Sequence, residues 1–256
     1  MGQIISQELV RIENLLDGEL HDVAVAKALE HLGAPGFPRK LLPEARLYSD
    51  YLPKAAEVQP TQRQRALHFL WDAFDKLPVS VIADFAIPFR RMIAERLFRS
   101  CGANFIADEG VRFNFGMLLD VGDDVFLNRG VFLDTKGGVS LGDAVCLTEW
   151  VALFTHTHSE ARHVERTYGP VMLEPYVKVY SDAIILPGVT VGAEAIIGAR
   201  SLVHRDVDPG EVVAGIPAHP VRERATDGRH GAELEHYWFA ERAFQTDPRR
   251  ARALQA

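Results

Sequence analysis

The chain has 256 residues, with 28 Lys and Arg against 35 Asp and Glu, so its formal net charge is −7. This acidic balance argues against a nucleic-acid partner, since proteins that bind nucleic acid over their whole surface are usually basic. Its two cysteines, Cys101 and Cys146, predict no disulfide framework and fit a cytoplasmic location. The sequence shows no secretory signal and no apolar run near the ~20 residues that span a bilayer.

Residues 1–100 predict an α-helical N-terminal region. Apolar residues recur at helical spacing between residues 3 and 32, and Pro60-Thr61 resembles the start of another helix. A third helix is expected from Val79 to Ser100, with a kink at Pro88. We expect these helices to cover one open end of the domain that follows.

Four arginines lie on the third expected helix. They are Arg90, Arg91, Arg96 and Arg99. The favoured interpretation is a solvated helix face. The alternative is a surface attracted to acidic lipid or to an anionic carrier, which would give a peripheral membrane contact.

From Leu173 to Asp208 the sequence repeats every six residues. The first residue of every block is a branched aliphatic one, and the fifth is small or β-branched. The first residues are Leu173, Val179, Ile185, Val191, Ile197 and Val203. An α-helix does not tolerate this period with so many β-branched residues and turn glycines. One short strand and one corner per block, with the first residue pointing inward, accounts for the pattern and predicts a parallel β-helix.

Similar blocks begin earlier and are interrupted twice. They start at Val121, Leu127, Leu133, Leu141, Leu147 and Leu153. The step of eight residues from Leu133 to Leu141 accommodates two extra residues. The step of twenty from Leu153 to Leu173 predicts a loop, from about Thr155 to Met172, that leaves the coil and returns. Binding and chemistry concentrate on such loops.

After Asp208, prolines and Gly215 end the repeats, and residues 231–254 predict a terminal helix. Three regions are therefore expected: a helical region over 1–100, a β-helix over 101–224 and a helical tail over 225–256. A solenoid needs caps at its open ends, and the flanking helices would provide them. The fold class is mainly β, a parallel β-helix with an N-terminal α-helical region and a short C-terminal helix.

Three segments carry a resemblance to a known family. They are SLGDAVCLTEWVALFTHTHS, ILPGVTVGAEAIIGARSLVHRDV and VVAGIPAHPVRER. They resemble the hexapeptide-repeat acetyltransferases, and within them the maltose and galactoside O-acetyltransferases. The resemblance implies a left-handed β-helix, a homotrimer with active sites between neighbouring subunits, and no metal. It also implies acetyl-CoA as co-substrate and a hydroxyl of a small sugar-like or saccharide acceptor.

Acetyl transfer from a thioester to a hydroxyl needs a base for the hydroxyl proton, and histidine suits this role. The resemblance assigns the catalytic base to His158, in the predicted loop. His156 would share a face with His158 if the segment is extended. We interpret His156 and His163 as solvent-exposed side chains.

Other roles follow from the same resemblance. Asn128 matches an acceptor-binding asparagine, and Ser181 matches a serine whose backbone N–H lies near the thioester oxygen. The expected CoA-binding residues are Ala199, Ser201, Arg205 and Arg222. The chain departs from the family at Arg200, where a small residue is usual, and at Thr135 and Lys136, near which the family has acceptor-binding acids.

Two further functions fit the same fold. One resembles the γ-class carbonic anhydrases, with zinc held by histidines, although that class takes its ligands from the coils. The other is a non-catalytic scaffold that binds partners through its helical region. The sequence leaves open O- or N-acylation and whether the acceptor is a free sugar, a lipid-linked or polymeric saccharide, or an antibiotic.

Overall fold

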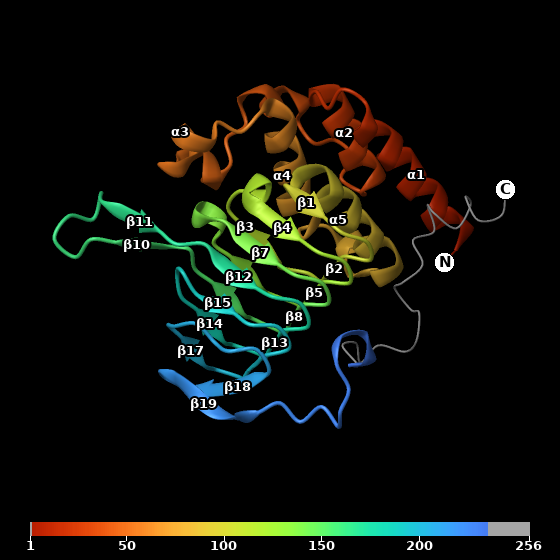
Figure 1. Ribbon diagram of the computed structural model, residues 1–256. Helices are drawn as coiled ribbons and strands as arrows, with labels where there is room; N and C mark the ends of the chain where they lie inside the picture. Colours follow the sequence, from red (N-terminus) through yellow and green to blue (C-terminus); the bar gives the residue numbers. More distant parts are fainter. Residues whose placement is uncertain (1, 235–256) are drawn as a thin grey trace. The chain divides into compact units, whose positions relative to one another are not determined.

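The computed structural model describes residues 2–234 (Figure 1). The chain divides into a helical unit that ends at Leu97 and a β unit that begins at Phe98. Most of the terminal helix expected over residues 231–254 lies outside the described residues, which end just after a short helical turn, η6 (Gly231–Glu233).

The helical unit consists of α-helices and short 3-10 helices. These are α1 (Gln3–Asp17), α2 (Asp22–His31), η1 (Arg39–Glu44), η2 (Tyr48–Tyr51), α3 (Lys54–Val58), α4 (Gln62–Phe74), η3 (Pro78–Val81) and α5 (Ala83–Leu97). The start of α4 follows the prediction because Thr61 forms a capping box. Its hydroxyl accepts from the Gln64 N–H at 3.2 Å, and the Gln64 side chain accepts from the Thr61 N–H at 2.8 Å. Every helix in the described part of the chain is too short or too polar to cross a membrane.

The arginines of α5 do not form the expected solvated face. Arg90 is only 2% exposed, with Nη2 2.5 Å from Asp75 Oδ1 and its guanidinium 5.0 Å from the centre of the Phe74 ring. Arg91 is buried as well, and Arg96 pairs with Asp17 on α1. A buried guanidinium needs a partner that replaces water, so these side chains hold helices together instead of facing solvent.

The β unit winds through three parallel sheets, and each coil adds one strand to each sheet (Figure 1). The first sheet contains β1 (Ser100–Cys101), β4 (Leu119–Val121), β7 (Val139–Leu141), β12 (Val171–Leu173) and β15 (Thr190–Val191). The second contains β2 (Ile106–Ala107), β5 (Phe126–Leu127), β8 (Cys146–Leu147), β13 (Lys178–Val179), β16 (Ile196–Ile197) and β18 (Glu211–Gly215), with β19 (Ala218–Glu223) antiparallel at its edge. The third contains β3 (Arg112–Phe113), β6 (Phe132–Leu133), β9 (Ala152–Leu153), β14 (Ile184–Ile185) and β17 (Leu202–Val203). The predicted left-handed parallel β-helix is confirmed.

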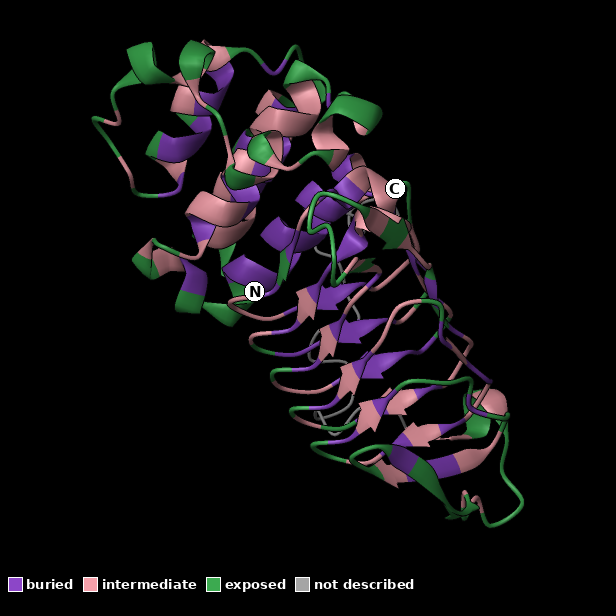
Figure 2. Cartoon of the chain, turned by 90° about the vertical axis from the view of Figure 1, so that its left-hand side faces the viewer, coloured by how far each residue is buried: buried purple, intermediate pink, exposed green. Residues whose placement is uncertain are grey.

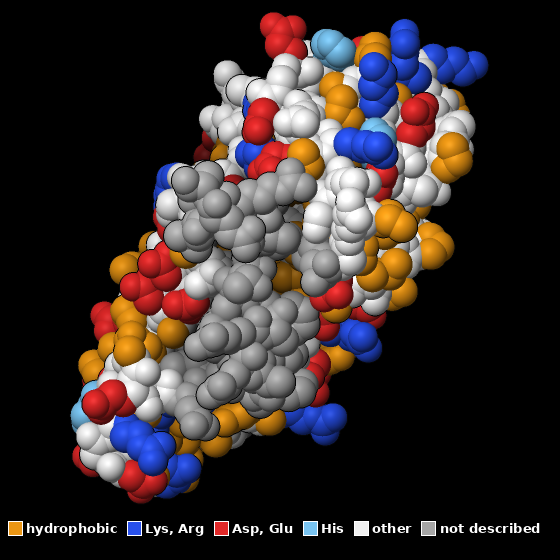
Figure 3. Space-filling view, turned by 90° about the vertical axis from the view of Figure 1, so that its right-hand side faces the viewer, with side chains coloured by type: hydrophobic (Ala, Val, Ile, Leu, Met, Phe, Trp, Pro, Cys, Tyr) orange, Lys and Arg blue, Asp and Glu red, His pale blue; other side chains and the backbone are white. Residues whose placement is uncertain are grey.

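The repeat residues fill the inside of the coil as predicted. The first residues of the six blocks from Leu173 to Val203 are all at most 2% exposed. They stack in register; Leu127, Leu147 and Val179, for example, follow one another in the second sheet. Figure 2 shows buried residues repeating from strand to strand, with exposed residues at the corners. On the described part of the face in Figure 3, acidic and basic side chains are interspersed.

The corner between the second and third sheets uses left-handed backbone in every coil. Its residues are Gly110, Gly130, Trp150, Asp182 and Arg200, with φ between 57° and 73°. Non-glycine residues adopt this conformation at a cost of roughly 1–2 kcal/mol, which the packed coils offset. Arg200, noted above as a departure from the family, is thus a corner residue, and its side chain is 83% exposed.

Replacing Gly130 with alanine should destabilise the protein more than the same change at Gly110. Both glycines have positive φ, at 72° and 73°, but a Cβ at Gly130 would overlap the Trp150 ring, whereas at Gly110 its nearest neighbour would be 3.5 Å away. We expect Gly110→Ala to cost about 1 kcal/mol from backbone strain and Gly130→Ala a further 1–3 kcal/mol, roughly, from overpacking. Urea unfolding measures both, and Trp150→Ala should relieve the extra cost. Equal costs at the two positions would contradict this packing.

Candidate active site

A two-stranded hairpin leaves the coil where the sequence predicted a loop. Strands β10 (His156–His158) and β11 (Arg166–Tyr168) lie between β9 and β12 and extend away from the coils (Figure 1). Its base is anchored by the fully buried Thr155. The Thr155 hydroxyl accepts from the Gly137 N–H at 2.7 Å and donates to the Asp134 carbonyl at 2.5 Å. The loop histidines therefore start from a fixed point on the coil.

The His158 ring is oriented by the backbone of the hairpin. Its Nδ1 lies 2.8 Å from the carbonyl oxygen of His163, and the two rings stack with centres 4.0 Å apart. A carbonyl can only accept, so Nδ1 carries the proton of this hydrogen bond. In the neutral ring Nε2 is then left with a lone pair, as a general base requires.

His156 is not the exposed side chain that we expected. Its ring is half-buried, its Nδ1 is hydrogen-bonded to Asp134 Oδ2, and its Nε2 lies 3.2 Å from His158 Nε2. The signal for this contact was the two-residue spacing of the histidines, which places both side chains on one face of a strand. The partner Asp134 could not be inferred, because it comes from the preceding coil. His163, by contrast, is exposed as expected.

Asp134 is a fully buried carboxylate at the centre of this cluster. Lys136 Nζ lies 2.8 Å from its Oδ1, and the Thr155 N–H donates to Oδ2 at 3.1 Å. Burial raises the pKa of Asp134, but the hydrogen bonds from Lys136 and His156 outweigh it and hold that pKa below its ordinary value. Asp134 is therefore ionised at neutral pH, and His156 Nδ1 is the donor toward it.

The Asp134 carboxylate should stabilise the fold in a pH-dependent way. Because its pKa is lower in the folded than in the unfolded chain, its stabilisation is present above the unfolded value, about 3.9, and is lost as pH falls through the folded value. Asp134→Asn should reduce the free energy of unfolding by about 3 kcal/mol at neutral pH, since it leaves Lys136 without its charge partner. Urea titrations from neutral to acidic pH should show this difference shrinking below about pH 4. A difference independent of pH would contradict the ionised carboxylate.

A second polar group lies at the corner between the second and third sheets. Ser181 Oγ donates to Glu149 Oε2 at 2.9 Å and lies 3.1 Å from Thr148 Oγ1. Asn128, one coil earlier, is 6% exposed. The pKa of Glu149 is held below its ordinary value, most of all by a hydrogen bond from the backbone of Glu149 itself. Burial opposes this shift, and hydrogen bonds from the Ser181 and Asn128 side chains add to it. Asn128 and Ser181 thus meet around Glu149, which the sequence analysis did not single out.

The residues expected along CoA differ in their exposure to solvent. Ala199 is exposed at the same corner, one coil after Ser181. Ser201 is 1% exposed, and its hydroxyl accepts from the Gly215 N–H at 3.1 Å, so its side chain is buried within the coil. Arg205 and Arg222 are both exposed.

One chain does not bring the two polar groups together. His158, with Asp134 and His156, lies where the chain leaves the third sheet, whereas Asn128 and Ser181 lie where it enters that sheet. The two corners are separated by one side of the coil, about six residues or ~20 Å of extended chain. The predicted base and the predicted acceptor and thioester contacts are therefore on different edges of the same subunit.

Known acetyltransferases are similar to this chain in sequence and in structure. No family model matches it. It is 29% identical over 145 residues to the galactoside O-acetyltransferase of Escherichia coli, a match that covers 55% of this chain and 71% of that protein. A hexapeptide-repeat acetyltransferase of Vibrio cholerae superposes with a TM-score of 0.55 at 26% identity, covering 62% of this chain and 92% of that chain. In sequence and in fold, the chain resembles the hexapeptide-repeat acetyltransferases. It is also 29% identical over 131 residues to a colanic acid biosynthesis acetyltransferase of Escherichia coli, covering 50% of this chain and 72% of that protein.

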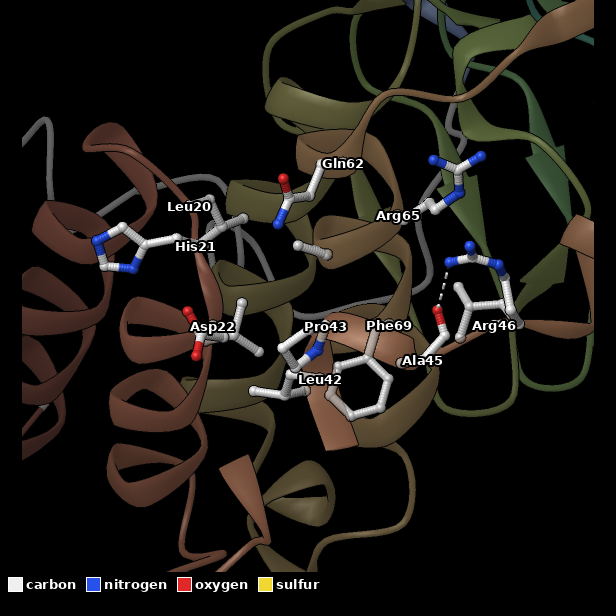
Figure 4. Close-up of a pocket in the computed structure, with 13 residues that line it drawn as sticks. Leu20, His21, Asp22, Leu42, Pro43, Ala45, Arg46, Gln62, Arg65 and Phe69 are labelled. Carbon is white, nitrogen blue, oxygen red and sulfur yellow. Dashed lines mark hydrogen bonds between the residues drawn. The ribbon is translucent and has the colours of Figure 1, made fainter. Parts of the chain in front are cut away.

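Residues 2–234 contain no group of three or more His, Cys, Asp or Glu side chains placed to hold a metal ion. A cavity of about 290 Å³ lies within the helical unit (Figure 4). Leu20, Leu42 and Phe69 line it, with Arg46 and Arg65 on the same side of it. It includes none of the predicted site residues.

Proposed function

We propose that the chain is an acetyl-CoA-dependent O-acetyltransferase that acts on a hydroxyl of a sugar or saccharide-like acceptor, by direct transfer with His158 as general base. The observation that carries the proposal is the 2.8 Å contact between His158 Nδ1 and the His163 carbonyl, which keeps the ring proton on Nδ1 and the lone pair on Nε2, the atom that would accept the hydroxyl proton. Two relatives support the donor and acceptor classes. One is named galactoside O-acetyltransferase, and the Vibrio cholerae acetyltransferase has been solved with acetyl-CoA.

In the proposed reaction the acceptor hydroxyl donates its hydrogen bond to His158 Nε2. As the hydroxyl oxygen attacks the thioester carbon, its proton passes to Nε2 and the carbonyl electrons move to the oxygen. The backbone N–H of Ser181 stabilises that oxyanion. When the intermediate collapses, the carbon–sulfur bond breaks and the CoA sulfur takes the proton from Nε2, giving an acetyl ester and CoA.

The protonation state of the buried Cys146 thiol supports direct transfer. Burial raises the pKa of Cys146 to about 11; Lys178 opposes this shift and Glu149 adds to it. The thiol is therefore protonated at neutral pH and is a poor nucleophile for an acetyl group. The two free cysteines, Cys101 and Cys146, also accord with a cytoplasmic location.

The proposed assembly is a homotrimer with its active site between neighbouring subunits. His158 would come from one copy, and Asn128, Ser181 and Ala199 from the next. The separation of these residues on two edges of one coil supports this arrangement, because no single subunit then offers both halves of the site. Arg205 and Arg222 would meet the phosphates at the nucleotide end of CoA.

The test is an acceptor panel with acetyl-CoA and the full chain, in which released CoA thiol is titrated. Methyl glycosides, oligosaccharides, chloramphenicol and primary amines form the panel. We expect thiol release that depends on a hydroxyl acceptor, and thermal stabilisation by CoA of about 2.7 kcal/mol at a hundred times its Kd. If CoA thiol is not released and CoA does not stabilise the protein, the proposal is overturned in favour of a scaffold. Stoichiometric zinc in the purified protein would favour a metal enzyme.

A further inference from the structure

An exposed indole lies on the corner between the second and third sheets. Trp150 is 57% exposed, and its backbone is left-handed, with φ at 61°. A Cβ built on Gly130 would lie 2.7 Å or less from three consecutive atoms of the six-membered ring, Cδ2, Cε3 and Cζ3. A point beyond the edge of a ring cannot lie so close to three of its atoms, so Gly130 lies over one face of the indole. The opposite face is the one that solvent reaches.

The indole is held in place by the backbone of the corner. Gly130 and Gly110 occupy the same corner position in the two preceding coils, so no side chain separates the ring from the backbone beneath it. The Trp150 N–H donates to the Arg129 carbonyl at 3.0 Å. A ring that is already ordered loses little entropy when a ligand stacks on it. The free face of Trp150 is therefore a preformed apolar platform.

Charged side chains of the same corner border this platform. Arg129 Nε lies 2.9 Å from Glu109 Oε1 in the preceding coils, and Arg200 Nε lies 3.4 Å from Asp182 Oδ2 in the following coils. A pyranose has a matching distribution of groups, since its C–H bonds make one face apolar and its hydroxyls form a polar rim. Rim hydroxyls can donate to the carboxylates and accept from the guanidinium groups. An alkyl chain has no such rim.

The position of the platform along the coil assigns it to the acceptor. The indole lies over Gly130, two residues after the proposed acceptor contact Asn128. The proposed thioester contact, Ser181, is one coil after Trp150, so Trp150 lies on the coil between the two. Ala199, expected along CoA, is two coils after Trp150, or ~10 Å at the usual spacing of strands, and on the side away from the ring.

We infer, as a step that rests on the proposed function, that Trp150 is a specificity-determining residue on whose free face the apolar face of the acceptor's sugar ring stacks. Such stacking covers about 50 Å² of apolar surface on the indole, which corresponds to about a tenfold change in affinity. The site therefore recognises the closed ring and not only its hydroxyls. Cyclic pyranosides are preferred over acyclic polyols.

The experiment compares kcat/KM for a methyl pyranoside and for erythritol, an acyclic polyol with as many hydroxyls, in the full chain and two variants. The unmodified protein should prefer the pyranoside. Trp150→Leu keeps an apolar side chain but removes the flat ring. We expect its kcat/KM for the pyranoside to fall about tenfold through KM, with little change for erythritol. Trp150→Phe is the matched control and should keep most of the preference, whereas a merely structural role would affect both substrates alike.

Fluorescence measures the same contact without turnover. Trp71 is only 2% exposed, so Trp150 is the more accessible indole within residues 2–234. Adding the methyl pyranoside in the absence of acetyl-CoA should change the fluorescence of the unmodified protein, and Trp150→Phe should lose this change. Urea unfolding shows whether the variants fold. If they do not, the preference of the unmodified protein for the pyranoside over erythritol decides.

The outcomes separate this inference from the function on which it rests. An unchanged preference for the pyranoside in Trp150→Leu overturns the platform alone. A loss confined to chloramphenicol also overturns it, because the indole would then stack on an aromatic acceptor. So does a tenfold loss of affinity for CoA, which would assign the ring to the nucleotide. A fluorescence change with the pyranoside but transfer to no acceptor supports the platform and overturns the proposed function.

Discussion

His158→Ala should lower kcat by at least about 10²-fold while the affinity for CoA stays near normal. In the proposed mechanism the imidazole takes the hydroxyl proton, since the His163 carbonyl holds its Nδ1–H at 2.8 Å and leaves the lone pair on Nε2. Its removal leaves the proposed CoA contacts, Ala199, Arg205 and Arg222, unchanged. Initial rates with saturating acetyl-CoA measure the first effect, and thermal stabilisation by CoA measures the second.

His163→Ala provides the control. The contact that orients His158 comes from the backbone carbonyl of residue 163, which alanine retains, and only the stacked ring is lost. We expect kcat to fall less than about tenfold, far less than for His158→Ala. Turnover in His158→Ala equal to that of the unmodified enzyme would remove His158 from the mechanism.

Leu173→Ala should reduce the free energy of unfolding by about 2–5 kcal/mol, whereas Met172→Ala should change it by less than about 1 kcal/mol. Both residues lie on β12 and have similar volume, but Leu173 is 2% exposed inside the coil and Met172 is 45% exposed on its outer face. Truncating the inner residue leaves a cavity between coils, and truncating the outer one does not. Urea unfolding at one fixed protein concentration compares them.

Equal losses at the two positions would contradict the inward orientation of the first residue in each block. They would also undermine the position of the hairpin, since β12 is the strand to which the chain returns after β11. The stability of this coil and the placement of His158 are therefore tested by the same pair of variants.

The β-helix could be predicted because its signal is local. Each block of six residues contains its own strand and corner, so the inward side chain recurs at a fixed place in the sequence. Val179 and Ile185, six residues apart, are both 0% exposed for this reason. Departures from the period were equally informative: the extra length between Leu153 and Leu173 is the hairpin.

The helical unit was less predictable at the level of side chains. The helix period shows which residues are apolar, but not which polar partner arrives from a neighbouring helix. Arg90 was expected in solvent because Asp75, its partner, belongs to a segment fifteen residues earlier in the chain. Burial of a charge depends on such a partner, and periodicity carries no information about it.

By itself, the sequence determined the coil, the place of the loop and the resemblance that singles out His158. Only the tertiary structure decided what lies around that histidine. Asp134 reaches His156 across 22 positions of sequence, because one turn of the coil places it beneath the hairpin. The distance between side chains on successive coils depends on how the strands stack and how each corner bends. The six-residue repeat in the sequence carries no information about either.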